Sequence, residues 1–398
     1  MKILMLTPYL PYPLLSGGQI RTYNLLKNLS HKHEITLFSF IRNEKEKQYI
    51  NRLKEYCVAV EVFLKRPPWT LTSLALSAVT FYPLVVCMYL NKVVKEAIAK
   101  AIEIERFDLI HAETFYVMPN IPNYSVPIIL IEQTIEYLVY QHYTELVSFI
   151  PKRILMDWDV AKIHFWEKRF WKKATRVVAM STSDKQVMQN LVSDLKVDLV
   201  PNGVDTTFFS GKRRKEKKQD KTILFVGNFK WLQNREAVSI LVKDIWPHIK
   251  KDLPQAKLWI VGRYPSEEIL NFASSSIIVS QDIDDIREVY KKSDVLLAPL
   301  YGPGGTRFKI LESMAAGLPV VTTATGIEGL GARHGYHALI SNDKKSLALE
   351  TVRLLTHRSL YQKLAENGRK LVEKNFNWIG IANSLDRIYK EAAQENEN

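Results

Sequence analysis

The stretch SDVLLAPLYGPGGTRFKILESMAAGLPVVTTATGIEGL, residues 293–330, decides the fold. It begins with Asp294–Leu300, a Val/Leu-rich run bounded by turn residues, which predicts a buried strand of a parallel sheet. Glycines follow, and apolar residues then recur at helical spacing over 308–315. Gly317 and the next proline end this helix, and Val320–Thr323 is predicted to be another strand. The order strand, glycine turn, helix, strand indicates an α/β protein with a doubly wound parallel sheet.

The glycine turn and the helix start form a candidate phosphate site. Free backbone N–H groups and the positive end of the helix dipole both favour an anion there. Arg307 and Lys309 are cations at the same helix start, where they oppose the dipole unless an anion lies between them. Glu312 follows one turn later, where it could accept hydrogen bonds from sugar hydroxyls. An ordinary βαβ turn, whose glycines serve geometry and whose charges face water, fits the local pattern equally well.

The segment GGTRFKILESMAAGLPVVTT, with TATGIEGL behind it, resembles the donor site of a known family. It is similar to retaining glycosyltransferases of group 1, also called family 4, which have the GT-B fold of two doubly wound Rossmann-like domains facing a central cleft. The likeness is greatest to the polysaccharide-biosynthesis sugar-transferase branch, whose motif reads GGGTRLKILEAMA. Most relatives carry two glutamates spaced E-x7-E. Here the second is Glu312 but the first position is Gly304, so an acid that touches the transferred sugar in many relatives is missing.

The resemblance implies an enzyme that moves a sugar from a nucleoside-diphosphate donor to a glycan or lipid-linked acceptor, with retention of configuration. Arg307, Lys309 and Glu312 are then the candidate catalytic residues: the two cations stabilise the departing diphosphate and Glu312 fixes the ribose. Because Arg307 and Lys309 would stabilise the charge of the leaving diphosphate, neither a metal ion nor a cofactor is expected. GNFKWLQN at 227–234 resembles a family loop whose basic residue faces the diphosphate. The implied donor-binding residues are Gly227, Asn228, Lys230, Ile283, Gly304, Gly305, Thr306, Arg307, Lys309 and Glu312.

The length of 398 residues suits two domains. We predict an N-terminal acceptor-side domain over 1–210, completed by a C-terminal helix at 376–398. The family-like strand and turn LVPNGVD closes the first part, and the run KRRKEKKQDK makes 211–221 a solvated linker. The nucleotide-sugar-binding domain is then 222–375. The linker lacks the interleaved aromatic residues or motif that nucleic-acid binding needs, so no nucleic acid is expected as a partner.

A second glycine loop lies near the N-terminus. MKILMLTPYL is better read as a first strand than as a signal peptide. Gly17 and Gly18 follow at the start of a predicted helix, where relatives approach the donor phosphates or the acceptor, although such a pair commonly marks only a tight turn. His111 and Glu113 end another predicted strand and are further candidates for the acceptor side of the cleft. A histidine there is more often a satisfied structural residue.

Composition excludes several classes of protein. Apolar residues make up 46% and charged residues 24%, which is typical of a globular protein. Cys57 and Cys87 have neither metal-ligand spacing nor a disulfide framework, which fits a reducing cytoplasm. The aspartates flanking Ile283 form a D-x-D triplet, but one such triplet is expected by chance in this chain. We therefore predict no required metal.

The net charge of +13 favours an anionic surface. Pro67–Asn91 contains no charged residue, yet Pro83 and its Ser/Thr content argue against a membrane span. Lys65, Arg66 and Lys92 flank this region, as in interfacial helices. We predict a cytoplasmic enzyme that docks peripherally on the inner membrane face. The alternative is that the region is ordinary core and the charge aids solubility.

Two other functions remain open from the sequence. A nucleotide-sugar epimerase of the same fold would bind the same donor but need titratable residues at the sugar, for which His111 and Glu113 are the candidates. A non-catalytic partner subunit is made plausible by Gly304, whereas Arg307, Lys309 and Glu312 argue against it.

Overall fold

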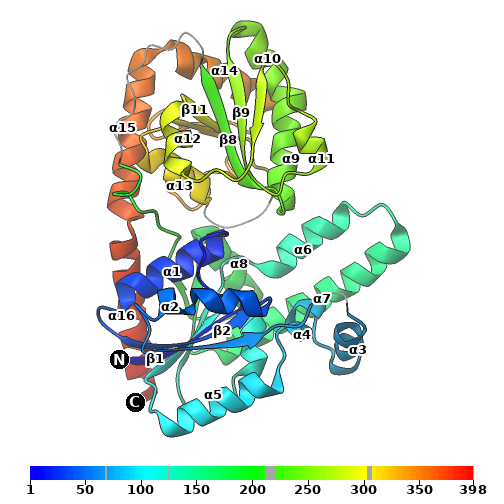
Figure 1. The fold of residues 1–398 in the computed structure, drawn as a ribbon, viewed down its shortest axis with the longest axis vertical. Coiled ribbons are helices and arrows are strands. Elements are labelled where there is room, and N and C mark those ends of the chain that lie inside the picture. The colour runs from blue at the N-terminus through cyan, green and yellow to red at the C-terminus, as the bar shows by residue number, and fades with distance from the viewer. Residues whose placement is uncertain (68–69, 124, 211–220, 303–306, 398) are drawn as a thin grey trace. The chain divides into compact units, whose positions relative to one another are not determined.

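The computed structural model describes residues 1–397 apart from 68–69, 124, 211–220 and 303–306. The chain divides into two compact units (Figure 1). Unit 1 is Met1–Pro201 with Trp378–Asn398, and unit 2 is Asn202–Asn377. Residues 202–210, which we expected in the first domain, belong to unit 2 because the Val204 N–H donates to the Phe376 carbonyl at 2.7 Å and Phe209 lies in the core of unit 2. Most of the predicted linker lies outside the described residues.

Unit 1 contains a seven-stranded parallel sheet in the order β3-β2-β1-β4-β5-β6-β7. The strands are β1 (Lys2–Thr7), β2 (Glu34–Ile41), β3 (Ala59–Leu64), β4 (Leu109–Glu113), β5 (Ile128–Ile131), β6 (Arg176–Ala179) and β7 (Val197–Leu199). The helices are α1 (Gly17–Leu29), η1 (Glu44–Tyr49), α2 (Ile50–Leu53), α3 (Leu71–Thr80), α4 (Leu84–Cys87), α5 (Lys92–Ile104), η2 (Phe115–Asn120), α6 (Glu136–Glu145), α7 (Ile150–Lys173), α8 (Thr182–Leu191) and α16 (Trp378–Glu397). Most central strands are buried along their length, as expected when helices cover both faces of a parallel sheet.

Unit 2 contains a six-stranded parallel sheet in the order β10-β9-β8-β11-β12-β13. The strands are β8 (Thr222–Asn228), β9 (Lys257–Arg263), β10 (Ile277–Ser280), β11 (Val295–Ala298), β12 (Val320–Thr322) and β13 (Leu339–Ile340). The helices are α9 (Leu232–Ile240), η3 (Leu241–Ile245), α10 (Trp246–Asp252), α11 (Glu267–Leu270), α12 (Ile286–Lys292), α13 (Phe308–Ala315), α14 (Lys344–Thr356) and α15 (Arg358–Asn375). The predicted α/β class with doubly wound parallel sheets is therefore confirmed.

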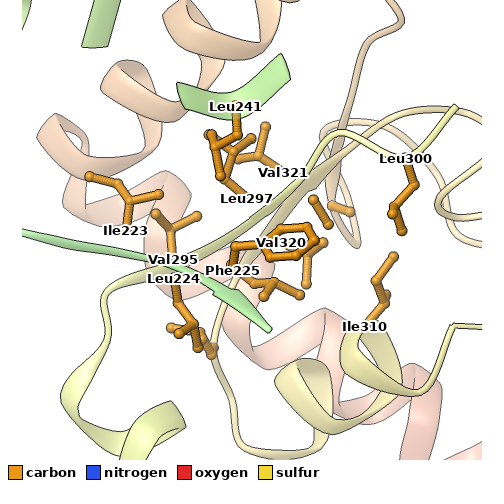
Figure 2. Packing of buried hydrophobic residues seen from close by; sticks show 14 of the residues in the cluster. Ile223, Leu224, Phe225, Leu241, Val295, Leu297, Leu300, Ile310, Val320 and Val321 are labelled. Atoms are coloured by element: carbon orange, nitrogen blue, oxygen red, sulfur yellow. The ribbon is translucent and has the colours of Figure 1, made fainter. Parts of the chain in front are cut away.

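The core of unit 2 fixes α13 against the sheet. Side chains of β8, β11 and β12 interdigitate beneath the helix (Figure 2). Ile310, on the buried face of α13, is fully enclosed together with Leu300 and Phe225. Burying such a side chain stabilises the fold by roughly 1.5–3 kcal/mol. The apolar face of the helix thus sets the directions in which its polar residues point.

In both sheets the strand order reverses beside the first strand. The chain moves outward on one side from β1 to β3, then returns to place β4 on the other side of β1. Unit 2 repeats the pattern, with β8 between β9 and β11. Such a reversal leaves a crevice at the carboxyl ends of the two diverging strands, where open α/β sheets bind ligands. The β8/β11 and β1/β4 positions are therefore the places to look for a site.

Candidate active site

Two side chains connect the carboxyl end of β8 with the helix that follows β11. Lys309 Nζ, from the first turn of α13, donates to Asn234 Oδ1 at 2.7 Å. Asn234 Nδ2 in turn donates to the Asn228 carbonyl at 2.8 Å. Because β8 and β11 are neighbours in the sheet, this chain of hydrogen bonds spans the strand-order reversal of unit 2. The predicted residues Lys309 and Asn228 are thus brought together.

Lys309 is held in an environment that disfavours its charge. Its Nζ lies 4.2 Å from the centroid of the Phe225 ring. Burial, followed by the neighbouring Arg307 guanidinium, lowers the pKa of Lys309 well below its ordinary value. Arg307 precedes the first turn of α13, and its Nη2 donates to the Gly302 carbonyl at 2.7 Å. An anion placed against these two cations would relieve their mutual repulsion.

Glu312, one turn further along α13, is oriented by a tyrosine that the sequence analysis missed. The fully buried Tyr290 of α12 donates from Oη to Glu312 Oε2 at 2.8 Å. Burial raises the pKa of Glu312 to about 7, against the opposing effects of this hydrogen bond and of Lys309. The carboxyl group is therefore fixed in direction and changes charge near neutral pH.

A pair of glycines brings β8 and β9 unusually close at the same edge. Gly227 and Gly262 are register partners, and a Cβ on Gly262 would lie 1.8 Å from the Gly227 carbonyl oxygen. A Cβ on Gly227 would lie 3.1 Å from Asn234 Cγ. Only glycine fits at 262, and the side chain of Asn234 occupies the space over 227. The side chain of Asn234 therefore covers the backbone of Gly227, next to Asn228.

The remaining donor-side candidates lie around this centre. The exposed Lys230 places Nζ 3.7 Å from the centroid of the Tyr264 ring, a second aromatic partner that sequence reasoning missed. Ile283 is half-buried between β10 and α12 and packs against the core of unit 2. Gly304, Gly305 and Thr306 lie outside the described residues. Among the residues that are described, no cluster of three His, Cys, Asp or Glu side chains is arranged for a metal ion.

In unit 1 the second glycine loop follows β1, at the place where the strand order reverses between β1 and β4. Gly17 begins α1, and Ser16 caps the helix by accepting from the Gln19 N–H. A Cβ on Gly18 would lie 2.2 Å from Tyr9 Oη and 2.6 Å from Gln133 Oε1. An alanine at 18 would push the ends of both side chains aside, so these side chains pack closely against the loop.

His111 and Glu113 are both fully buried and belong to one hydrogen-bonded network. His111 Nδ1 lies 2.5 Å from Tyr389 Oη of α16, and its Nε2 lies 3.2 Å from Glu113 Oε1. Gln133 Nε2 donates to Glu113 Oε2 at 2.8 Å and also to Tyr9 Oη. Burial alone would raise the pKa of Glu113, but the hydrogen bond and charge of His111, with Arg21, hold it below the usual value. Both residues lie beneath the surface that Tyr9 and Gln133 present.

Arg21 is a buried cation that the sequence analysis did not single out. It is 1% exposed and donates from Nη1 to the Pro201 carbonyl at 2.8 Å and from Nη2 to the Val200 carbonyl at 3.0 Å. These carbonyls belong to the LVPNGVD segment. Arg21 thus ties the helix after the glycine loop to the end of the last strand in unit 1.

Both units match models of known protein families. The model described as Glycosyltransferase Family 4 covers residues 15–208, and the model described as Glycosyl transferases group 1 covers residues 220–357. The chain belongs to this glycosyltransferase family. The resemblance seen in the α13 segment therefore extends through both units.

Individual relatives of this chain are distant, and it spans about half the length of the curated relatives that it matches. A phosphatidyl-myo-inositol mannosyltransferase of Mycobacterium leprae is 26% identical over 227 residues, which are 55% of this chain and 59% of the relative. Sucrose-phosphate synthase of Thermosynechococcus elongatus superposes with a TM-score of 0.77 at 17% identity, over 99% of this chain and 100% of that one. HepE of Anabaena, in complex with UDP and glucose, gives a TM-score of 0.68 at 17% identity, over 98% and 100%. These structures show that the two Rossmann-like units have the GT-B fold.

The predicted membrane region of this chain divides into two parts. The α4 end is ordinary core, because Val85, Val86 and Cys87 are buried. Arg66 is exposed and donates from Nη1 to the Leu90 and Cys87 carbonyls, whereas Lys65 is half-buried near the Tyr89 ring. The α3 end is exposed. None of the helices in the described ranges is both long and apolar enough to cross a bilayer.

Proposed function

We propose that the protein transfers a sugar from a nucleoside-diphosphate sugar to a glycan or lipid-linked acceptor, with retention of configuration and without a metal ion. The observation that carries the proposal is the Lys309–Asn234–Asn228 connection at the strand-order reversal of unit 2, one helical turn from Glu312. HepE binds UDP and glucose in a chain of the same fold, and the mycobacterial relative is named for a lipid, phosphatidyl-myo-inositol. Both fit this proposal.

The difficult step is departure of the diphosphate from an oxocarbenium-like sugar. In the proposed reaction the bond from the anomeric carbon to the diphosphate oxygen breaks as the acceptor oxygen forms a bond to that carbon, and the proton of the acceptor hydroxyl passes to the leaving diphosphate. Arg307 and Lys309, together with the N-terminus of α13, stabilise the negative charge that grows on the leaving group. Such preorganised charge is usually the largest catalytic contribution. A bound diphosphate also favours the protonated form of Lys309, whose pKa burial and Arg307 lower in the empty protein.

Glu312 is proposed to hold the ribose. Tyr290 occupies Oε2, so a ribose hydroxyl would approach Oε1. An ionised carboxylate accepts hydrogen bonds at both oxygens, whereas the protonated form must donate one. With the pKa of Glu312 raised to about 7, this contact strengthens as the pH rises through neutrality.

The acceptor side is proposed to lie at the β1/β4 reversal of unit 1. Gly17 and Gly18 form the loop there, and Tyr9 and Gln133, whose side-chain ends pack against Gly18, are the side chains proposed to face the acceptor. His111 and Glu113 act as positioning residues, because they hold Gln133 from below through the 2.8 Å hydrogen bond. No general base is assigned, which suits a retaining reaction in which the leaving phosphate assists the incoming acceptor.

The same geometry weighs against the two alternatives. An epimerase requires titratable groups in contact with the sugar, but His111 and Glu113 are fully buried and hydrogen-bonded to each other. A non-catalytic subunit has no need of a lysine whose charge is disfavoured by its surroundings. Both observations favour sugar transfer.

Thermal unfolding in the presence of nucleoside-diphosphate sugars tests the proposal. A donor at one hundred times its dissociation constant should add about 2.7 kcal/mol to the free energy of unfolding, and EDTA should not reduce this effect. Transfer to acceptor-bearing lipid extracts should likewise survive EDTA. Stabilisation by no nucleoside diphosphate would refute the donor site, and strict dependence of transfer on Mn²⁺ or Mg²⁺ would refute the metal-independent mechanism.

A further inference from the structure

Helix α3 in unit 1 has its polar and apolar faces reversed relative to an ordinary surface helix. Its sequence LTSLALSAVT contains no charged residue, and its only buried side chains are Ser73 and Ser77. Leu71 and Val79 are each 86% exposed, and Leu74 is 43% exposed. A helix that folds against a protein normally turns its apolar stripe inward. Here the apolar stripe faces outward.

The reversal has a cause inside the protein. Lys162 of α7 is buried and donates from Nζ to Ser77 Oγ at 2.6 Å and to the Tyr82 carbonyl at 3.3 Å. Ser77 Oγ also donates to the Tyr82 carbonyl at 2.7 Å, and Asp159 pairs with Lys162 at 3.0 Å. A buried charge requires such partners. The serines of α3 are therefore drawn inward, which leaves Leu71, Leu74 and Val79 outside, while Leu76 is half-buried.

The outward face of α7 continues the apolar surface of α3. The exposed ring of Phe81, directly after α3, contacts two exposed rings of α7, with centroids 5.9 Å from Trp158 and 6.0 Å from Phe165. Ile150 and Ile154 precede them on the same helical stripe and are 68% and 63% exposed. Helices α6 and α7 extend as a hairpin away from the sheet of unit 1, with α3 beside α7 (Figure 1). We call the exposed apolar side chains of α3, Phe81 and α7 the apolar face.

Charge along α7 identifies the occupant of this face. The stripe carries Ile150, Ile154, Trp158 and Phe165, with the exposed Asp157 at its edge. It becomes basic at Lys168, which is half-buried, and at Arg169 and Lys172, which are exposed. The apolar part is roughly 22 Å long at about 1.5 Å per residue. A bilayer presents the matching order, hydrocarbon first and anionic head groups next to water. A protein partner has no reason to repeat that order.

We propose that the apolar face is a membrane-docking surface that inserts into the interface of an anionic bilayer, with Lys168, Arg169 and Lys172 at the head groups. The surface differs from the one expected from sequence, since Lys65, Arg66 and α4 do not form it. Docking needs neither the donor nor the catalytic residues, so it stands independently of the proposed function. It would place the protein where lipid-linked acceptors are found.

Vesicle co-sedimentation tests this with the full chain. The test variant is Leu71→Asp with Ile154→Asp, and the matched control is Ile104→Asp with Leu349→Asp, at positions 70% and 62% exposed. Both double variants change the charge equally and replace exposed side chains. We expect the wild type to bind vesicles containing phosphatidylglycerol, more weakly at high salt and least to pure phosphatidylcholine. The test variant should bind at least tenfold more weakly and the control like the wild type.

Several outcomes would overturn the proposal. One is absence of wild-type binding to anionic vesicles at low salt, and another is wild-type binding by the test variant. A concentration-dependent dimer that both aspartates abolish, without vesicle binding, would assign the apolar face to a second copy of the chain. Thermal unfolding checks that the variants are folded. If the double test variant does not fold, the single variant Leu71→Asp replaces it. Donor-induced stabilisation should be the same in all folded variants, so a failure of docking is distinguishable from a failure of the donor site.

Discussion

Replacing Lys309 is expected to change both the turnover and the pH dependence of stability, and the two effects can be measured separately. Its pKa is lowered from 10.5 in the folded protein, mainly by burial and then by Arg307. The folded chain therefore binds fewer protons than the unfolded chain in the window between the lowered pKa and 10.5. Stability rises with pH through such a window, by at most about 1.4 kcal/mol per pH unit for one proton. The burial of Lys309 thus destabilises the empty protein at pH values below 10.5.

Lys309→Met removes the charge and keeps an unbranched side chain over Phe225. It should lower turnover by about 10²-fold, as expected when a charge contact to the transition state is lost. The stability of the variant should lack the rise with pH, so the wild type gains on the variant as the pH rises from the lowered pKa of Lys309 towards 10.5. The lost hydrogen bond to Asn234 subtracts about 1 kcal/mol from the variant at every pH.

Calorimetry measures the stability from the unfolding transition whose temperature the donor raises. Steady-state kinetics at fixed pH measures the turnover. The control is Lys363→Met, which removes an exposed lysine whose Nζ lies 5.7 Å from the centroid of the Tyr336 ring. We expect wild-type turnover from the control. A stability difference between wild type and Lys309→Met that is independent of pH, together with wild-type turnover, would show that Lys309 is only a structural lysine.

Two further predictions concern the donor and acceptor sides. Because burial raises the pKa of Glu312 to about 7, affinity for the sugar nucleotide should increase up to about tenfold from pH 6 to pH 8, and Glu312→Gln should bind more weakly with no such slope in a calorimetric titration. An equal slope in the variant would remove Glu312 from the ribose role. Gly18→Ala places a Cβ 2.2 Å from Tyr9 Oη, so turnover should fall at least tenfold while donor binding is unchanged. Normal turnover in Gly18→Ala would exclude this loop from the acceptor side.

Local patterns predicted the elements that hold the donor site. The buried strand β11, the helix α13 and the strand β12 follow from apolar spacing and from the glycine and proline after the helix. The contact between Lys309 and Asn234 joins residues 75 positions apart, and only the resemblance of the 227–234 loop pointed to it. Tyr290 gave no signal, because a tyrosine in a short amphipathic helix is ordinary until the sheet places α12 against α13.

The surroundings of His111 and Glu113 and the orientation of α3 were harder to predict. The sequence left two interpretations of His111 open, a residue that contacts a ligand and a satisfied structural residue, and its burial agrees with the second. Their burial depends on Tyr389, which comes from a helix far along the chain. For α3 the sequence showed that charged residues are absent. It did not show that the apolar side chains of the helix face outward. That orientation depends on Lys162, whose need for hydrogen-bond partners outweighs the usual preference for apolar contacts.

The discontinuity of unit 1 has a consequence for synthesis on the ribosome. Helix α16 is made only after the whole of unit 2, yet it supplies Tyr389 to His111 and Asp386, 3.0 Å away, to His33. The seven-stranded sheet thus emerges with this side uncovered, and unit 2, which is continuous, can complete its core first. Folding therefore departs from the usual order in which the N-terminal domain finishes before the next one begins. In a nascent chain stalled before α16, the surface that Leu385 and Ile388 cover in the folded protein would be exposed to chaperones. Completion of α16 would then cover this surface.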